Sequence, residues 1–148
     1  MESAPGCWRI YGEVLAREYG DPAYYAHHSL SVDAYAVQHP GRPSRQTIRS
    51  VALHLARLYA ILECNVPADR ANDCMKRFAE SDPSALHWLE PPANCGDITV
   101  VDAAAAAGAA AHAAIVREWA QSAWDAWSPH HAQIRAWAEA FVRKLHLQ

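Results

Sequence analysis

The amino-acid sequence predicts an all-α protein in which four or five antiparallel helices form one bundle with a single long, irregular crossover. Apolar residues recur at helical spacing along most of the chain, and no segment alternates apolar and polar residues as a strand does. The clearest core-facing stripe, with successive spacings of four, three, four and three residues, consists of Thr47, Val51, His54, Leu58 and Ile61. The 148 residues are enough for one domain (1–148) with its own hydrophobic core.

Composition and charge argue against several classes of protein. The apolar fraction is 51% and the charged fraction is 20%, an ordinary balance for a globular domain. The net charge of −3 argues against a nucleic-acid partner, which usually requires a basic face. The apolar stretch Ile98–Val116 consists mainly of alanine and includes Asp102 and His112, so it is too weakly hydrophobic to span a bilayer.

The cysteines and the first residues indicate the compartment. The four cysteines lie far apart and form no C-x-x-C pair, so we expect free thiols in a reducing cytoplasm. Residues 1–11 contain charged residues and a proline and no apolar run, which is unlike a signal peptide. We therefore expect a cytoplasmic protein that has neither a membrane nor a nucleic acid as its partner.

We expect the first two helices over residues 7–19 and 22–38. Asp21 is a good N-cap for the second helix, and Pro22 fits its first position. Apolar residues lie on two faces of this helix, which predicts that it is buried on two sides. Asp33 lies on one of these faces, so its carboxylate needs a donor or a metal, because an unpaired buried carboxylate is costly.

The middle of the chain is predicted to form two helices and the crossover. Ser44 is suited to cap a third helix over residues 45–62, and residues 68–80 form a fourth, more polar helix. The crossover, over about residues 81–98, contains three prolines and has no helical periodicity. Irregular connections of this kind often cover a pocket.

The last third of the chain is predicted to be helical again. Thr99 opens a fifth helix, and Asp102 stands at its third position, as in a capping box. The alanine-rich stretch that follows, to Ala114, implies close approach to another helix. Ser128 and Pro129 are suited to the N-cap and the first turn of the last helix.

Histidine is frequent, with nine in the chain, and we predict that three of them point inward from different helices: His28, His54 and His131. Helical bundles build metal sites by directing such side chains from several helices into the core. Three imidazoles and an open position suit a catalytic divalent metal, zinc in the first place, with iron or nickel as alternatives. His27 can replace His28, and His130 can replace His131, because each pair is adjacent.

The leading hypothesis places this metal site under the crossover of a small-molecule enzyme: a hydrolase, a thiol-dependent transferase or an isomerase. The metal activates a bound water or thiol, and Asp33 or His39 takes the proton. Gln38 is a further candidate partner for the ligands. Asp33 also has a structural interpretation, as a buried acceptor or as the ion-pair partner of Arg49 or Arg57, for example.

Two other functional classes remain open. In the first, the protein is a non-catalytic ligand-binding or dimerisation module with structural histidines. The alanine-rich helix and a tryptophan face formed by Trp119, Trp124 and Trp127 then make the homodimer contact. In the second, the protein is a metal-free enzyme that uses histidine and aspartate as acid and base on a small organic substrate.

Several segments of the sequence resemble an uncharacterised bacterial family of unknown function. The segments are P-G-C-W-x-x-Y-G-E-V-L-A-R-E-Y (Pro5–Tyr19), H-x4-D-A-Y-A-V-Q-H-P (His28–Pro40), H-L-x-x-L (His54–Leu58) and W-A-x-S-A-W-x-A-W-x-x-H-H (Trp119–His131). The resemblance spans nearly the whole chain and implies membership of that family, but no particular activity.

The chain is more distantly similar to the DinB/YfiT-like metal-binding bundles. Those proteins hold a divalent metal with a histidine on the second bundle helix and an H-x-x-x-H pair on a later helix. His54 stands at a comparable mid-helix place, and H-H-A-Q-I (His130–Ile134) is similar to the second half of the pair. Trp127 stands in place of the first histidine of the pair, so His28 is the candidate for the third ligand. The resemblance implies a metal-dependent enzyme.

Overall fold

The structure is a computed structural model that describes residues 5–80 and 83–146. Within these residues the chain forms no strand and eight α-helices: α1 (Pro5–Gly20), α2 (Pro22–Tyr25), α3 (His28–Gln38), α4 (Arg45–Leu58), α5 (Ala68–Glu80), α6 (Val100–Ala105), α7 (Ala109–Ala126) and α8 (His131–His146). A π-helical turn, Tyr59–Glu63, continues α4, and a 3-10 turn, Ser128–His130, precedes α8. The all-α prediction is confirmed.

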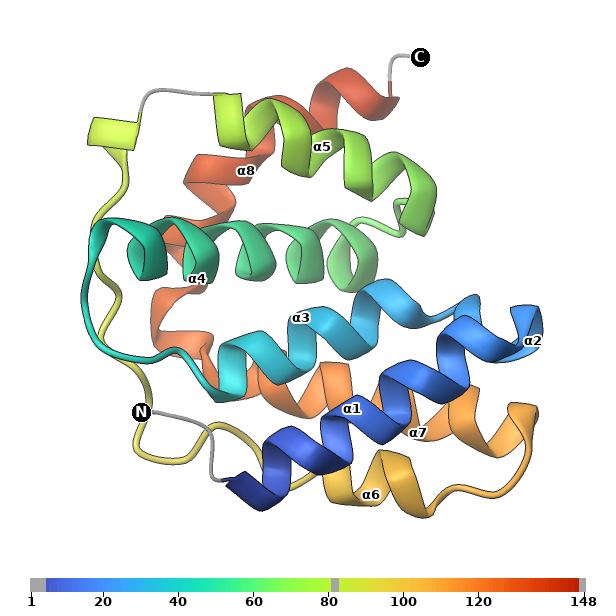
Figure 1. The fold of residues 1–148 in the computed structure, drawn as a ribbon. Coiled ribbons are helices and arrows are strands. Elements are labelled where there is room, and N and C mark those ends of the chain that lie inside the picture. The colour runs from blue at the N-terminus through green and yellow to red at the C-terminus, as the bar shows by residue number, and fades with distance from the viewer. Residues whose placement is uncertain (1–4, 81–82, 147–148) are drawn as a thin grey trace.

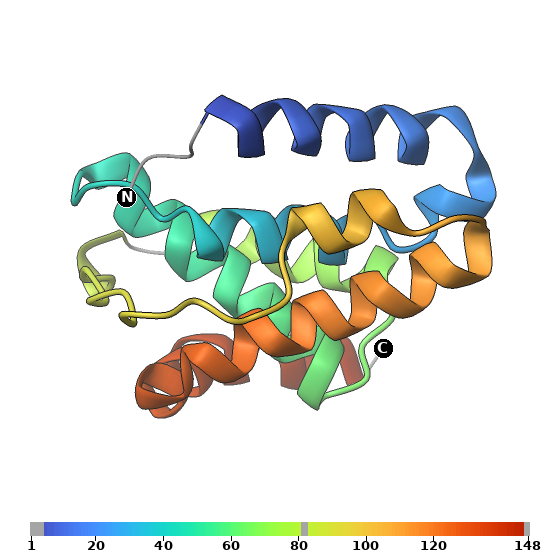
Figure 2. The same ribbon diagram turned by 90° about the horizontal axis from the view of Figure 1, so that it is seen from below.

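Helix α3 is the central element of the fold. Figure 1 shows α5, α4, α3 and α1 one below another, with α7 and α8 behind them. Helix α3 packs against α4 on one side and against α7 on another, and six of its residues are buried. Figure 2 shows α1 on one outer side of the molecule, where it packs against α6. The predicted burial on two sides is therefore confirmed for α3.

Two of the expected helices are interrupted. The prediction of one helix over residues 22–38 is wrong, because the chain turns at Ala26 and His27 between α2 and α3. The short α2 packs against α1 and α7 instead of continuing along the axis of α3, and its Tyr24 ring meets the ring of His112 edge-on. The alanine-rich stretch likewise breaks between α6 and α7, where Gly108 has a φ of +92°.

Three of the predicted helix starts are confirmed by their caps, whereas Ser128 does not cap the last helix: it begins a 3-10 turn without a side-chain cap bond, and α8 begins at His131. The backbone N–H of Ala23 donates to the Asp21 carboxylate over 2.9 Å. Ser44 and Thr99 each cap a helix with a complete capping box, in which the third helical residue bonds back to the N-cap backbone. These local hydrogen bonds set where α2, α4 and α6 begin.

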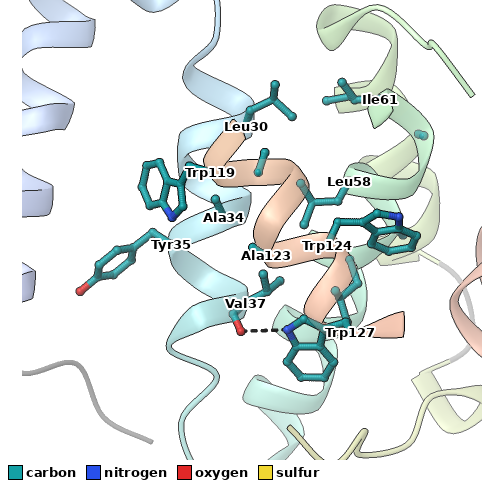
Figure 3. Packing of buried hydrophobic residues seen from close by; sticks show 14 of the residues in the cluster. Leu30, Ala34, Tyr35, Val37, Leu58, Ile61, Trp119, Ala123, Trp124 and Trp127 are labelled. Carbon is teal, nitrogen blue, oxygen red and sulfur yellow. Dashed lines mark hydrogen bonds between the residues drawn. The ribbon is translucent and has the colours of Figure 1, made fainter. Parts of the chain in front are cut away.

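The hydrophobic core contains three large tryptophans that belong to α7 and its end. Trp119, Trp124 and Trp127 are at most 1% exposed, and Figure 3 shows them packed against residues of α3 and α4. The Trp127 indole N–H donates to the Val37 carbonyl over 3.1 Å, and the Trp119 N–H donates to Gln38 Oε1 over 2.7 Å. Because these rings are buried within one chain, the geometry does not support the alternative in which they form a dimer contact. A homodimer through another surface stays a prediction.

No helix in the described part of the chain is both long enough and apolar enough to cross a membrane.

Candidate functional site

Asp33, at the middle of α3, is fully buried and pairs with Arg57 of α4. Arg57 Nε donates to Oδ2 of Asp33 and Nη2 donates to Oδ1, each over 2.7 Å. This bidentate arrangement is the strongest way for a guanidinium to neutralise a carboxylate. The predicted ion pair of Asp33 with Arg57 is confirmed, whereas Arg49 is exposed.

His54 lies one turn before Arg57 on α4, and its Nδ1–H donates to Oδ1 of Asp33 over 2.7 Å. The geometry fixes the hydrogen on Nδ1, because a carboxylate can only accept. Nε2 therefore carries the lone pair of the neutral ring. The side chain is 18% exposed, and Nε2 has no partner among the described residues.

Arg57 is held in place by further bonds. Its Nη1 donates to Asn72 Oδ1 over 2.7 Å, and Nη2 also donates to the Ser29 carbonyl over 3.2 Å. We call Asp33, His54 and Arg57 the Asp33 cluster. Its members come from two packed helices, and a third helix supports it through Asn72, so the positions of the charged atoms are fixed by the fold.

A second buried carboxylate, Glu18 of α1, has a different set of partners. It accepts hydrogen bonds from His28 Nδ1 over 2.9 Å, from Ser31 Oγ over 2.5 Å and from His112 Nε2 over 2.8 Å. Glu18, Ser31 and His112 are fully buried. We call these four residues the Glu18 cluster; it joins α1, α3 and α7.

Arg17 extends the Glu18 cluster toward the end of α6. Its guanidinium donates to the carbonyls of Ala103, Ala104 and Ala106 and contacts His112 Nδ1 at 3.4 Å. Because Arg17 can only donate, Nδ1 of His112 accepts and its Nε2 carries the hydrogen given to Glu18. Both ring nitrogens of His112 are therefore occupied.

Sequence reasoning missed Glu18, although a signal was present. Glu18 follows Tyr11 by seven residues and Val14 by four, so the three share one face of α1. Tyr11 and Val14 are both buried. A carboxylate on the same face as two core residues implies a buried acceptor.

The structure places the three predicted metal ligands in different environments. His28 belongs to the Glu18 cluster and His54 to the Asp33 cluster. His131 Nε2 donates to the Trp124 carbonyl over 2.8 Å, and its ring stacks on the Trp124 ring. Within residues 5–80 and 83–146, no group of three or more His, Cys, Asp or Glu side chains is placed to hold a metal. The geometry thus gives no support to a shared three-histidine centre, and a divalent metal stays a prediction.

The other predicted site residues have structural contacts. His39 Nδ1 donates to the Tyr35 carbonyl over 2.9 Å, and the two rings stack with centroids 4.1 Å apart. Gln38 donates to the carbonyls of Cys95 and Ile98, which fastens the crossover to the end of α3. In the described part of the chain, His39 makes no hydrogen bond with the Asp33 cluster, and its predicted catalytic role stays a prediction.

The adjacent histidines that sequence reasoning left open are separated by the structure. His130 Nε2 donates to the Glu90 carbonyl over 2.8 Å, which ties the start of α8 to the crossover. His27 does not join the Glu18 cluster with His28; it lines a cleft at the start of α3.

The crossover covers a cleft of about 390 Å³ against the turn between α3 and α4, lined by Trp88, Glu90 and Cys95 among others. None of the three predicted metal ligands is among its lining residues, so the predicted place of the metal site is not supported. Burial raises the pKa of the Cys95 thiol, whose Sγ–H donates to the Pro92 carbonyl. A protonated, bonded thiol is a poor nucleophile.

Tyr11 of α1 is close enough to both buried carboxylates to be affected by each. Burial raises the pKa of Tyr11, and the negative charges of Glu18 and Asp33 raise it further. Its ring stacks on Tyr35 with centroids 3.8 Å apart. The phenol is therefore protonated at neutral pH and is a hydrogen-bond donor, not a base.

The fold and the two clusters define an all-α protein in which each of two buried carboxylates is bonded to histidine. The chain belongs to a family of unknown function, DUF5946, which it matches over residues 1–128. The predicted membership of an uncharacterised family is confirmed. Both clusters lie within the matched residues, and His131 lies outside them. No match was found among curated proteins or among solved structures.

Proposed function

We propose that the Asp33 cluster is a general acid–base site for a reaction of a small molecule, and that His54 Nε2 transfers the proton. The observation that carries this proposal is the Asp33–His54 hydrogen bond of 2.7 Å, which leaves Nε2 without a partner among the described residues. A carboxylate that holds Nδ1–H fixes the tautomer that accepts a proton at Nε2.

The other two histidines that contact a buried carboxylate, His28 and His112, do not offer such a nitrogen. His112 gives Nε2–H to Glu18 and receives Arg17 at Nδ1. His28 gives Nδ1–H to Glu18, and the Tyr19 hydroxyl donates to its Nε2 over 3.2 Å. Of the three histidines that contact a buried carboxylate, His54 therefore has the nitrogen that is available to a substrate.

The proposed chemistry is illustrated by hydrolysis of a small ester. His54 Nε2 takes a proton from water while the water oxygen bonds to the acyl carbon, and it returns the proton to the departing alkoxide. Asp33 is a positioning residue that stabilises the imidazolium formed in between. Arg57 keeps the Asp33 carboxylate in its place.

The test uses p-nitrophenyl acetate as a simple ester. We expect His54→Gln to lower the rate of hydrolysis by about 100-fold, because a general base contributes roughly 10² to 10⁴ in rate. His87→Gln is the matched control, since His87 is an exposed histidine outside both clusters. Thermal denaturation of both variants verifies that they are folded. A folded His54→Gln variant with the wild-type rate would refute the proposal.

A divalent metal bound by His54 is the second candidate, and the same hydrogen bond favours it. Histidines that bind metals usually give their other N–H to a carboxylate, as His54 does to Asp33. The described residues supply no complete ligand set around His54, so we derive no reaction step through a metal.

A further inference from the structure

A cleft of about 260 Å³ lies where α3 begins, and neither Asp33 nor His54 is among its described lining residues. Its walls come from the start of α3, the π-helical turn, the start of α5 and one residue of α7. The buried side chains of Leu30, Ile61 and Val66 form an apolar floor. Figure 3 shows Leu30 and Ile61 facing one another from α3 and from the turn that follows α4.

Three polar side chains of the cleft have no side-chain partner among the described residues; Asn65 and Arg117 are exposed, and His27 is half-buried. His27, Asn65 and Arg117 line it, and none of them makes a side-chain hydrogen bond or ion pair with a described residue. No acidic side chain is among the described lining residues. Burial lowers the pKa of His27, and the positive charge of Arg117 lowers it further, while the negative charge of Glu18 opposes this shift.

We propose that this cleft binds a small organic carboxylate, a role that goes beyond the proposed acid–base site. The Arg117 guanidinium matches a carboxylate in a bidentate geometry, and His27 and Asn65 add hydrogen bonds to the same end of the ligand. The apolar floor receives the hydrocarbon part. The volume equals that of roughly nine waters at about 30 Å³ each, which suits a ligand smaller than a typical drug molecule.

A single cation with apolar walls favours a carboxylate over a phosphate. A phosphate dianion needs more positive charge than one guanidinium supplies. Among the described lining residues, Arg117 is the one side chain that is a lysine or an arginine. A carboxylate carries one negative charge, which Arg117 balances.

The experiment measures the binding of benzoate by titration calorimetry and by the shift of the His27 ring signals in NMR, identified with His27→Gln. We expect a dissociation constant of about 1 mM, as is usual for so small a ligand. Arg117→Gln is expected to weaken binding at least fivefold. Arg49→Gln, which removes an exposed arginine of α4, is the matched control and is expected to leave the affinity unchanged.

Other arms of the experiment separate the alternatives. Benzyl alcohol, which has the ring without the charge, is expected to bind at least fivefold more weakly than benzoate. His54→Gln is expected to bind benzoate like the wild type, so a failure of the acid–base proposal leaves this result intact. Equal affinity of Arg117→Gln and wild type, or inorganic phosphate binding more tightly than benzoate, overturns the proposal.

Discussion

The two buried carboxylates, Asp33 and Glu18, have different kinds of hydrogen-bond partner. Asp33 faces the permanent positive charge of Arg57 in a bidentate pair. Glu18 has no such partner: its donors are two imidazoles and the Ser31 hydroxyl, and Arg17 reaches only the far side of His112. A buried carboxylate that lacks a directly bonded cation depends on every hydrogen bond that it accepts.

This dependence gives a prediction for Glu18→Gln. The glutamine amide keeps one oxygen that can accept a hydrogen bond. Its NH₂ group replaces the second carboxylate oxygen and faces a side chain that donates to Glu18 in the wild-type protein. We expect the free energy of unfolding to fall by about 3 kcal/mol, in the range for breaking buried charge-assisted hydrogen bonds. Urea denaturation measures this. The control is Glu13→Gln, an exposed glutamate of the same helix, which should change stability by less than about 0.5 kcal/mol.

An equal loss of stability in the two glutamate variants would contradict the role assigned to Glu18.

At the residue scale, the sequence predicts pairs more readily than clusters. The cost of burying Asp33 was enough to predict an ion-pair partner, with Arg49 and Arg57 as the examples, and the apolar stripe was enough to point His54 inward. Helical periodicity gives the face on which a residue lies, but not how two helices are placed against each other. The sequence therefore did not reveal that His28 meets Glu18 while His54 meets Asp33.

At the scale of the helices, starts are predictable and interruptions are not. Asp21, Ser44 and Thr99 each mark a helix start through a hydrogen bond within three residues, which the local sequence encodes. The break around Gly108 lies in an alanine-rich stretch that is a good helix former by itself. That break depends on a tertiary contact, since Arg17 binds the carbonyls at the end of α6.

Gly108 gives a prediction at this scale. Its φ of +92° is unfavourable for any residue with a side chain, although a Cβ at this position would meet no atom within 4 Å. We expect Gly108→Ala to destabilise the protein by about 1 to 2 kcal/mol from backbone strain alone. Thermal and urea denaturation measure the change.

Gly12→Ala is the matched control, because Gly12 lies inside α1, is exposed and also has open space around its Cα. Alanine at this position should stabilise the helix by about 0.5 to 1 kcal/mol. The same sign of change in both variants would show that the conformation assigned to Gly108 is wrong.

At the scale of the whole molecule, α3 contributes residues to both clusters. His28 and Ser31 reach Glu18 of α1, and Asp33 reaches His54 and Arg57 of α4. The same helix contributes Val37 and Gln38 to the bonds with the tryptophans of α7 and its end. The geometry of the proposed site therefore depends on how α3 packs against α1, α4 and α7.

The response of the whole protein to metal removal distinguishes the two functional candidates. Under the acid–base proposal, dialysis against EDTA should change neither the melting temperature nor the rate of ester hydrolysis. Elemental analysis of protein purified without a histidine tag provides the complementary measurement. A near-stoichiometric divalent metal that disappears in His54→Gln would instead favour the metal candidate, because binding to the native state adds stability that removal takes away.

The sequence separation of the contacts in the two clusters also sets the order in which they can form during synthesis. Asp33 meets His54 and Arg57 only 21 and 24 residues later, whereas Glu18 meets His112 94 residues later. At a translation rate of about 5 to 20 residues per second, His112 is synthesised about 5 to 20 s after Glu18. Helix α1 therefore meets His28 and Ser31 of α3 early, whereas its bond to His112 forms only after α7 has been synthesised.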